Sequence, residues 1–150
     1  MILPSINTRK VMGDRLSKII IPRQLHNNLV SLAKNSLPNE SCALLVGKTK
    51  GEKVYVVDSI PMKNSDASAL TFSIDPQDLI NTYQKVEEQG MQVVGIFHSH
   101  PAEPLPSQTD KKFMEINPVV WLIYSTITDK YKAYVFEEKI KEVHIQHIMA

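Results

Sequence analysis

Two histidines, His98 and His100, lie two positions apart at the end of an apolar run that spans residues 93–97. The run predicts a buried strand that continues into the histidines. Side chains at positions i and i+2 of a strand point to the same face, about 6–7 Å apart along the strand. The two imidazoles are therefore expected to converge on one metal ion.

An acidic residue, Asp110, follows the histidines at a distance that allows it to return to them. Residues 101–106 contain three prolines and predict a stiff, irregular turn, and Ser107-Gln-Thr-Asp110 then predicts the start of a helix. Two histidines and one carboxylate leave a fourth tetrahedral position for water, as in catalytic zinc sites. A simpler interpretation stays open, because Ser-x-x-Asp also has the pattern of a capping box that only stabilises a helix N-terminus.

A metal site of this kind that hydrolyses its substrate needs, besides the metal, a group that transfers protons. Glu40 is the best candidate for this group. It follows the helix-breaking Pro38-Asn39 and precedes an apolar strand at residues 43–46, which could pair beside the histidine strand. A carboxylate there could take a proton from the catalytic water and pass it to the leaving amine. The Ser107 hydroxyl could donate a hydrogen bond to the oxyanion. The alternatives are that Glu40 is a solvated residue after a turn and that Ser107 is a plain N-cap.

Three segments together resemble a known motif. They are His-Ser-His-Pro at 98–101, Pro-Ser-x-x-Asp at 106–110, and Pro-x-Glu-x-Cys at 38–42 before a Leu-Leu-x-Gly strand. This pattern resembles the JAMM motif of the MPN+ metalloproteases, in their compact prokaryotic or archaeal form, over about residues 19–134. Six residues separate the second histidine from the serine, where the family commonly has seven.

The resemblance implies a role for each polar residue of the motif. His98, His100 and Asp110 match the zinc ligands of the family, Glu40 its general base, and Ser107 its oxyanion-stabilising serine. It therefore implies one zinc ion per chain, with a catalytic water.

The resemblance also implies an activity. We expect a deubiquitinase-like isopeptidase that hydrolyses the amide bond after the C-terminal Gly-Gly of ubiquitin or a ubiquitin-like modifier. Two alternatives stay open: a processing peptidase for a ubiquitin-fold sulfur-carrier protein, and a non-catalytic MPN scaffold subunit. The expected partners are conjugates of such modifiers, and the sequence leaves open association with a proteasome or a homodimer through the helix at residues 74–89.

Composition and charge exclude several other classes of function. The 150 residues are 43% hydrophobic and 22% charged, with a formal net charge of +1, so neither nucleic acid nor an anionic membrane is expected as a partner. The single cysteine, Cys42, excludes an intrachain disulfide and a cysteine-rich zinc site. Residues 1–18 lack a secretory pattern and no run is long enough to span a membrane, so a soluble cytoplasmic protein is expected.

Five further residues are expected to do no chemistry. We expect Glu103 in solvent, Trp121 in the core, and Cys42 as a buried, inert thiol. Ser99 should point away from its histidine neighbours and serve as a packing or hydrogen-bonding residue. On the polar face of the first helix, His26 is expected to be exposed.

The elements that must position the site predict an α/β protein of the α+β type. We expect an MPN/JAMM fold, cytidine-deaminase-like, with a mixed, mainly antiparallel curved sheet flanked by two main helices. Residues 1–150 are expected to form one domain, in which residues 1–15 are a flexible tail. The predicted strands are at 19–21, 43–46, 54–60, 70–74, 93–97, 119–124, 131–136 and 142–148, and the helices are at 22–36, 75–89 and, shorter, at 107–115.

Overall fold

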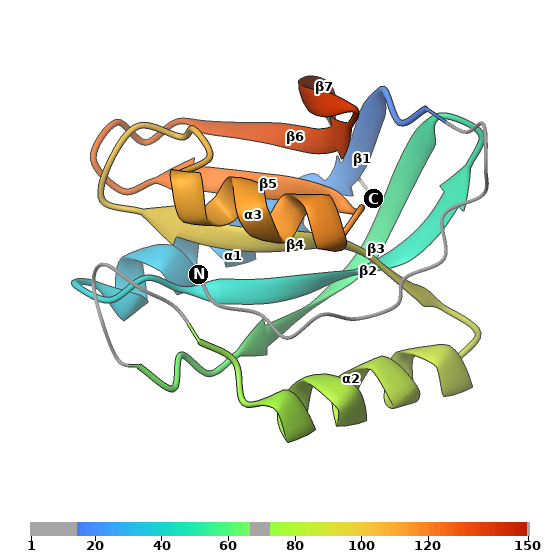
Figure 1. Ribbon diagram of the computed structural model, residues 1–150, viewed down its shortest axis with the longest axis horizontal. Coiled ribbons are helices and arrows are strands. Elements are labelled where there is room, and N and C mark those ends of the chain that lie inside the picture. Colours follow the sequence, from blue (N-terminus) through green and yellow to red (C-terminus); the bar gives the residue numbers. More distant parts are fainter. Residues whose placement is uncertain (1–14, 67–72, 150) are drawn as a thin grey trace.

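The computed structural model describes residues 15–66 and 73–149 of the chain. Seven strands and three helices lie in these residues (Figure 1). In chain order they are β1 (Lys18–Pro22), α1 (Arg23–Ser36), β2 (Cys42–Lys50), β3 (Lys53–Met62), α2 (Pro76–Glu88), β4 (Gln92–His100), α3 (Gln108–Ile116), β5 (Val120–Ser125), β6 (Tyr131–Glu137) and β7 (Lys139–Ile148).

The strands form one closed barrel in the order β1-β3-β2-β4-β5-β6-β7. Four neighbouring pairs are antiparallel (β2–β3, β2–β4, β5–β6 and β6–β7) and three are parallel (β1–β3, β1–β7 and β4–β5). The sheet is thus mixed and mainly antiparallel, as expected, but it closes on itself into a barrel, which the expectation of a curved sheet did not include. Closure occurs because β1 pairs with β3 on one side and with β7, from the other end of the chain, on the other side.

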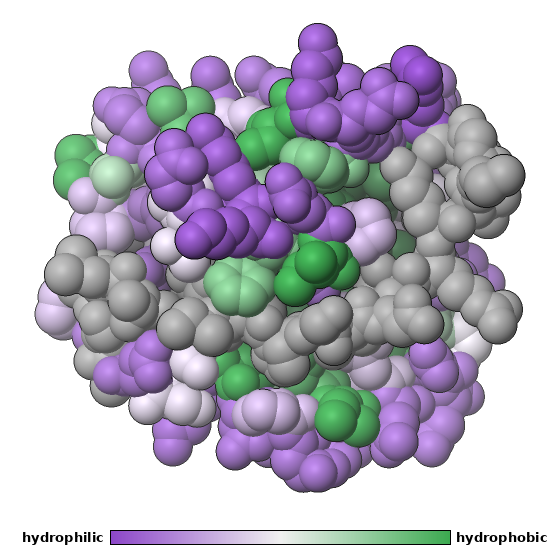
Figure 2. Space-filling model, viewed as in Figure 1, coloured by the Kyte–Doolittle hydropathy of each residue, from purple (hydrophilic) through white to green (hydrophobic). Residues whose placement is uncertain are grey.

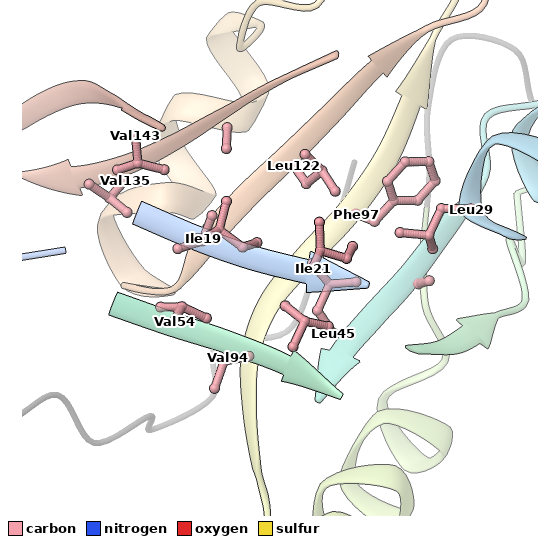
Figure 3. Close-up of a cluster of buried hydrophobic side chains, with 14 of the residues drawn as sticks. Ile19, Ile21, Leu29, Leu45, Val54, Val94, Phe97, Leu122, Val135 and Val143 are labelled. Carbon is pink, nitrogen blue, oxygen red and sulfur yellow. The ribbon is translucent and has the colours of Figure 1, made fainter. Parts of the chain in front are cut away.

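The inside of the barrel is an apolar core to which every strand contributes. Ile19 and Ile21 of β1, Leu45 of β2 and Phe97 of β4 point into it (Figure 3). Leu29 of α1 joins them, so this helix packs against the same core. Burying each such side chain fully contributes about 1.5–3 kcal/mol to the stability of the fold. The core therefore holds the strands that carry the site in place.

A second apolar cluster lies on the outer face of β2, β4, β5 and β6, beneath α2 and α3. Trp121 of β5 and Met114 of α3 are fully buried there, and the prediction that Trp121 belongs to a core is confirmed. In Figure 1, α3 lies in front of β4 and β5, and Figure 2 shows a hydrophilic surface at this place. Lys111 and Lys112 of α3 are exposed. Helix α3 is therefore amphipathic, with its apolar side on the sheet.

Local sequence signals set the ends of α2 as predicted. The side chain of Asp75 caps the helix by accepting hydrogen bonds from the backbone N–H groups of Gln77 and Asp78, and Pro76 occupies the first helical position. Gly90, with a positive φ of 74°, follows the end of the helix. The strand that follows this helix in the chain is β4, which carries the histidines.

Two predicted segments fall on residues outside the described part of the chain. Most of the strand expected at 70–74 lies within residues 67–72, and nearly all of the tail expected at 1–15 lies within residues 1–14. Beyond that tail, Leu16 is buried and its backbone N–H donates to the carboxylate of Glu137 at 2.8 Å. Among the described residues, no helix combines the length and the apolar composition needed to cross a membrane.

Candidate functional site

The two histidines lie side by side at the carboxyl end of β4. This strand extends through His100, further than residues 93–97. His98 contacts Trp121 of the outer cluster and both histidines contact Asp110 of α3, so both side chains lie on the outer face. His98 is fully buried and His100 is 9% exposed. Their Nε2 atoms are 2.7 Å apart, and the Trp121 ring packs on the His98 ring in a T-shaped arrangement with the ring centroids 5.8 Å apart. The predicted convergence of the two imidazoles is therefore present.

The third candidate ligand, Asp110, reaches the histidines from the first turn of α3. Its Oδ2 atom lies 3.2 Å from Nε2 of His98 and 3.1 Å from Nε2 of His100. The same oxygen accepts a hydrogen bond from the Ser107 backbone N–H at 2.9 Å, and the Ser107 hydroxyl accepts one from the Asp110 N–H at 3.1 Å. The capping box is present, and it aims Asp110 at the histidines. The capping role therefore does not exclude the ligand role, which stays a prediction.

The spacing of the three donor atoms fits a tetrahedral metal ion. Ligand atoms about 2.0–2.1 Å from such an ion are about 3.3–3.4 Å from one another. The two distances from the Asp110 oxygen are close to this value, and the separation of the histidine nitrogens is shorter. Two imidazole nitrogens and one carboxylate oxygen are also a ligand set that zinc accepts. Among the described residues, Oδ1 of Asp110 is buried without a hydrogen-bond partner, so it stays available to a further ligand or to water.

Glu40 lies beside the histidines because β2 pairs with β4. The pairing of residues 43–46 beside the histidine strand was predicted and is confirmed, with Cys42 opposite His98. Side chains alternate between the two faces along extended backbone, so Glu40, two residues before Cys42, lies on the same face as Cys42 and His98 and opposite His100. Oxygen and nitrogen atoms of Glu40, His98 and His100 all lie within 4.8 Å of one another. Glu40 is 6% exposed, which excludes the alternative of a solvated residue after a turn.

Burial and mutual contact shape the ionisation of these groups. Burial raises the pKa of Glu40, which suits a group that must both accept and release a proton. Burial also lowers the pKa of His98, which favours the neutral imidazole that metals bind. For Asp110, burial alone would raise the pKa, but His98 and the hydrogen bonds from His100, His98 and the Ser107 N–H together hold it well below its usual range.

Three hydrogen bonds that the sequence did not predict fix the segments around the site. The hydroxyl of Tyr134, on β6, donates to the carbonyl of Pro104 at 3.0 Å and so ties the proline-rich turn to the barrel. The backbone N–H and hydroxyl of Thr126 both donate to the carbonyl of His100, at 3.0 and 3.2 Å. Thr126 and His100 are 26 positions apart in the chain, and Tyr134 and Pro104 are 30 apart. Only the folded barrel brings the two residues of each pair together.

Ser107 lies at the N-cap of α3, and its side chain is exposed. Its oxygen accepts a hydrogen bond from the Asp110 N–H, and its own O–H remains able to donate. The capping role is therefore present, and the expected role in stabilising an oxyanion stays a prediction.

Residues outside the site mostly behave as expected, with one exception. Glu103 is exposed, and Cys42 is buried, where burial raises the pKa of its thiol. The prediction for His26 is wrong, because only 7% of this residue is exposed. Its ring packs on Tyr131 and His147, with centroids 4.0 and 4.6 Å away. The polar side of α1 thus faces the ends of β6 and β7, which the helical pattern alone does not reveal.

Comparison with known proteins identifies the family of the chain. Residues 22–137 match the family model described as prokaryotic homologs of the JAB domain. A desampylase of Pyrococcus furiosus is 36% identical over 132 residues, which cover 86% of this chain and 90% of that protein. A CysO-cysteine peptidase of Mycobacterium tuberculosis is 28% identical, covering 72% of this chain and 73% of that protein.

A solved structure agrees with the sequence comparisons. The solution structure of a protein from Desulfitobacterium hafniense superimposes with a TM-score of 0.77 and 29% sequence identity, covering 88% of this chain and 94% of that one. The shared fold, the sequence matches and the motif all support the same family. The chain therefore belongs to the prokaryotic homologs of the JAB domain, as a compact prokaryotic protein of the JAMM/MPN type.

Proposed function

We propose that this chain is a zinc-dependent peptidase that hydrolyses the amide bond after the C-terminal Gly-Gly of a ubiquitin-like modifier. The observation that carries the proposal is the convergence of His98, His100 and Asp110 beside the buried carboxylate of Glu40. The names of the relatives, desampylase and CysO-cysteine peptidase, support a hydrolytic role. A scaffold subunit would not need this set of residues.

In this proposal the metal is held by Nε2 of His98, Nε2 of His100 and Oδ2 of Asp110. Zinc, when bound, would supply Lewis acidity that acidifies the attacking water and polarises the scissile carbonyl. The capping box holds Asp110 in place, because the Ser107 N–H donates to the same oxygen that would bind the metal. Such supporting hydrogen bonds orient ligands and tune metal affinity.

The proton transfers fall to Glu40. Its carboxylate accepts a proton from the attacking water as the oxygen bonds to the carbonyl carbon, and it delivers that proton to the leaving nitrogen as the C–N bond breaks. The products are a carboxylic acid and an amine, and Glu40 returns to its starting state. In this proposal the Ser107 hydroxyl donates a hydrogen bond to the tetrahedral oxyanion.

An extended peptide could approach the site along β3. Strand β1 pairs with β3 only at residues 53–55, and β2 covers the other edge of β3 as far as Met62, opposite Cys42. Among the described strands, β3 beyond Tyr55 therefore pairs on one side only, and Val57, Asp58 and Pro61 are exposed there. A glycine-rich tail added to this edge would gain main-chain hydrogen bonds without needing side-chain pockets. The edge leads toward the candidate metal centre.

The test is cleavage of a modifier joined through Gly-Gly to a reporter amine, by the wild-type chain and by Glu40→Gln. We expect zinc-dependent cleavage by the wild type and a loss of about 100-fold or more in the variant, with unchanged zinc content. Equal cleavage by the two proteins would contradict the role of Glu40. No cleavage by a zinc-loaded wild type of any Gly-Gly conjugate would contradict the proposed function.

A second candidate is favoured by the mycobacterial relative, whose name specifies a CysO-cysteine bond. The chain would then release a single amino acid from the C-terminus of a ubiquitin-fold carrier. A modifier that ends in Gly-Gly followed by one cysteine separates the two functions. Faster cleavage of this substrate than of a lysine-linked conjugate would favour the processing peptidase.

A further inference from the structure

Two serines lie between the residues of the candidate site and face away from it. Ser41 follows Glu40, and Ser99 separates the two histidines. They are 4% and 1% exposed. Because side chains alternate along extended backbone, both serines point to the opposite side of the sheet from Glu40, His98 and His100. Among the described residues, their hydroxyls bond to each other and to the Ser41 backbone N–H, so they would affect the site through the backbone.

The two serines are joined by three hydrogen bonds. The Ser99 N–H donates to the Ser41 carbonyl at 3.1 Å, which continues the ladder between β2 and β4. The Ser41 N–H donates to the Ser99 hydroxyl oxygen at 3.0 Å, and the two hydroxyl oxygens are 2.9 Å apart. In a regular antiparallel ladder, a bonded pair exchanges two backbone hydrogen bonds. Here the Ser99 hydroxyl oxygen, in place of the Ser99 backbone carbonyl, accepts the hydrogen bond from the Ser41 N–H.

This replacement occurs where the chain enters β2. The donor is the N–H of the peptide unit that joins Glu40 to Ser41, so the Ser99 hydroxyl holds the backbone on which the Glu40 side chain is mounted. The Asn64 side chain approaches the carbonyl of the same peptide unit, at 3.4 Å. The carboxylate and the histidine nitrogens lie within 4.8 Å, and Ser99 belongs to the same strand as those histidines. One hydroxyl therefore links Glu40 to the strand that carries two of the candidate metal ligands.

We propose that Ser99 is a positioning residue, whose hydroxyl clamps the Glu40–Ser41 peptide unit to β4 and so sets the distance between the Glu40 carboxylate and the metal centre. This inference rests on the proposed hydrolytic function. Proton transfer requires the carboxylate within hydrogen-bond reach of the attacking water, and a displacement of about 1 Å can reduce a rate by about 100-fold. Without the clamp, the segment between α1 and β2 loses its attachment to β4 next to Glu40.

The chain offers a matched pair of variants that differ in this one bond. Ser99→Ala removes the oxygen that accepts from the Ser41 N–H. Ser41→Ala removes the other hydroxyl of the pair, and it leaves the clamp intact because the Ser41 N–H belongs to the backbone. Both substitutions delete one buried oxygen at neighbouring positions, so their general effects on packing should be similar. Ser99→Thr keeps the hydroxyl and serves as the conservative rescue.

We would measure kcat, KM and zinc content for the zinc-loaded full chain and for the three variants. We expect kcat of Ser99→Ala to fall by about 10- to 100-fold, with KM unchanged and the same zinc content as the wild type. Ser41→Ala and Ser99→Thr should keep most of the wild-type kcat. Amide hydrogen exchange at residue 41 should be faster in Ser99→Ala than in Ser41→Ala, because only the first variant loses the acceptor.

Three results would overturn the proposal. Equal kcat values for Ser99→Ala and Ser41→Ala at full zinc content would show that the clamp does not act on Glu40. A parallel loss of zinc and kcat in both variants would show a merely structural role. Equal exchange at residue 41 in these variants would show that the clamp does not exist in solution. A zinc-loaded wild type without peptidase activity would instead refute the proposed function, so the two failures are distinguishable.

Discussion

Tyr134 ties the turn between the histidines and Ser107 to the barrel, and removing its hydroxyl tests how this turn is held. The hydroxyl donates to the carbonyl of Pro104 at 3.0 Å, and both residues are buried. Tyr134→Phe removes one oxygen and leaves that carbonyl without its donor. An unsatisfied buried acceptor costs about 1–3 kcal/mol. For a chain of this length, we expect the melting temperature to fall by about 2–12 °C.

Urea denaturation at neutral pH measures this loss, and Tyr131→Phe is the matched control. The Tyr131 hydroxyl lies 3.3 Å from Nε2 of His147 and both residues are half-buried, so its removal should cost less than about 1 kcal/mol. Peptidase kcat should also fall more in Tyr134→Phe, because the freed turn leads directly to Ser107. Equal stability of the Tyr134→Phe variant and the wild type would refute the view that this bond holds the turn.

Two further predictions concern the metal ligand at α3 and a buried histidine. Asp110→Asn keeps an oxygen that can accept from the Ser107 N–H but removes the charge, so we expect zinc affinity to fall by more than about 100-fold while α3 persists. Ser107→Ala should cost about 1 kcal/mol and keep zinc, and a chelator titration that ranks the two variants the other way would contradict the ligand role. Burial, followed by His147 and Arg23, lowers the pKa of His26 to about 4. The unfolded chain binds this proton near pH 6.5, so stability should be full above that pH and fall by roughly 2–3 kcal/mol as the pH drops toward 4. Urea titrations at pH 7 and pH 4.5 should show a smaller loss for His26→Phe, and equal losses for the two proteins would contradict this account.

Local sequence patterns predicted the features whose determinants are close together in the chain. Asp75-Pro76 begins α2 and Gly90 follows it, and the capping box at Ser107 and Asp110 begins α3. The histidines converge because strand geometry alone places positions i and i+2 on one face. These parts depend on backbone periodicity and on hydrogen bonds within one turn, and both can be recognised in a single sequence.

The features that the sequence did not predict depend on contacts between distant segments. Barrel closure pairs Lys18 with His144, and nothing in the periodicity of either strand specifies that partner. The burial of His26 has the same cause, because α1 faces strands near the C-terminus and its own hydrophobic pattern does not show them. The position of Glu40 beside the histidines is the exception: it depends on a distant contact, and the predicted pairing of residues 43–46 with the histidine strand already implied it.

The central claim is that His98, His100 and Asp110 form one zinc site. We would measure zinc per chain in the purified protein, in a His98→Ala/His100→Ala double variant, and in Glu103→Ala, which changes an exposed carboxylate in the turn between His100 and Ser107. The account predicts about one zinc per chain in the wild type and in Glu103→Ala, and almost none in the double variant. A wild type that cannot take up zinc, or a double variant that binds as much as the wild type, would contradict it.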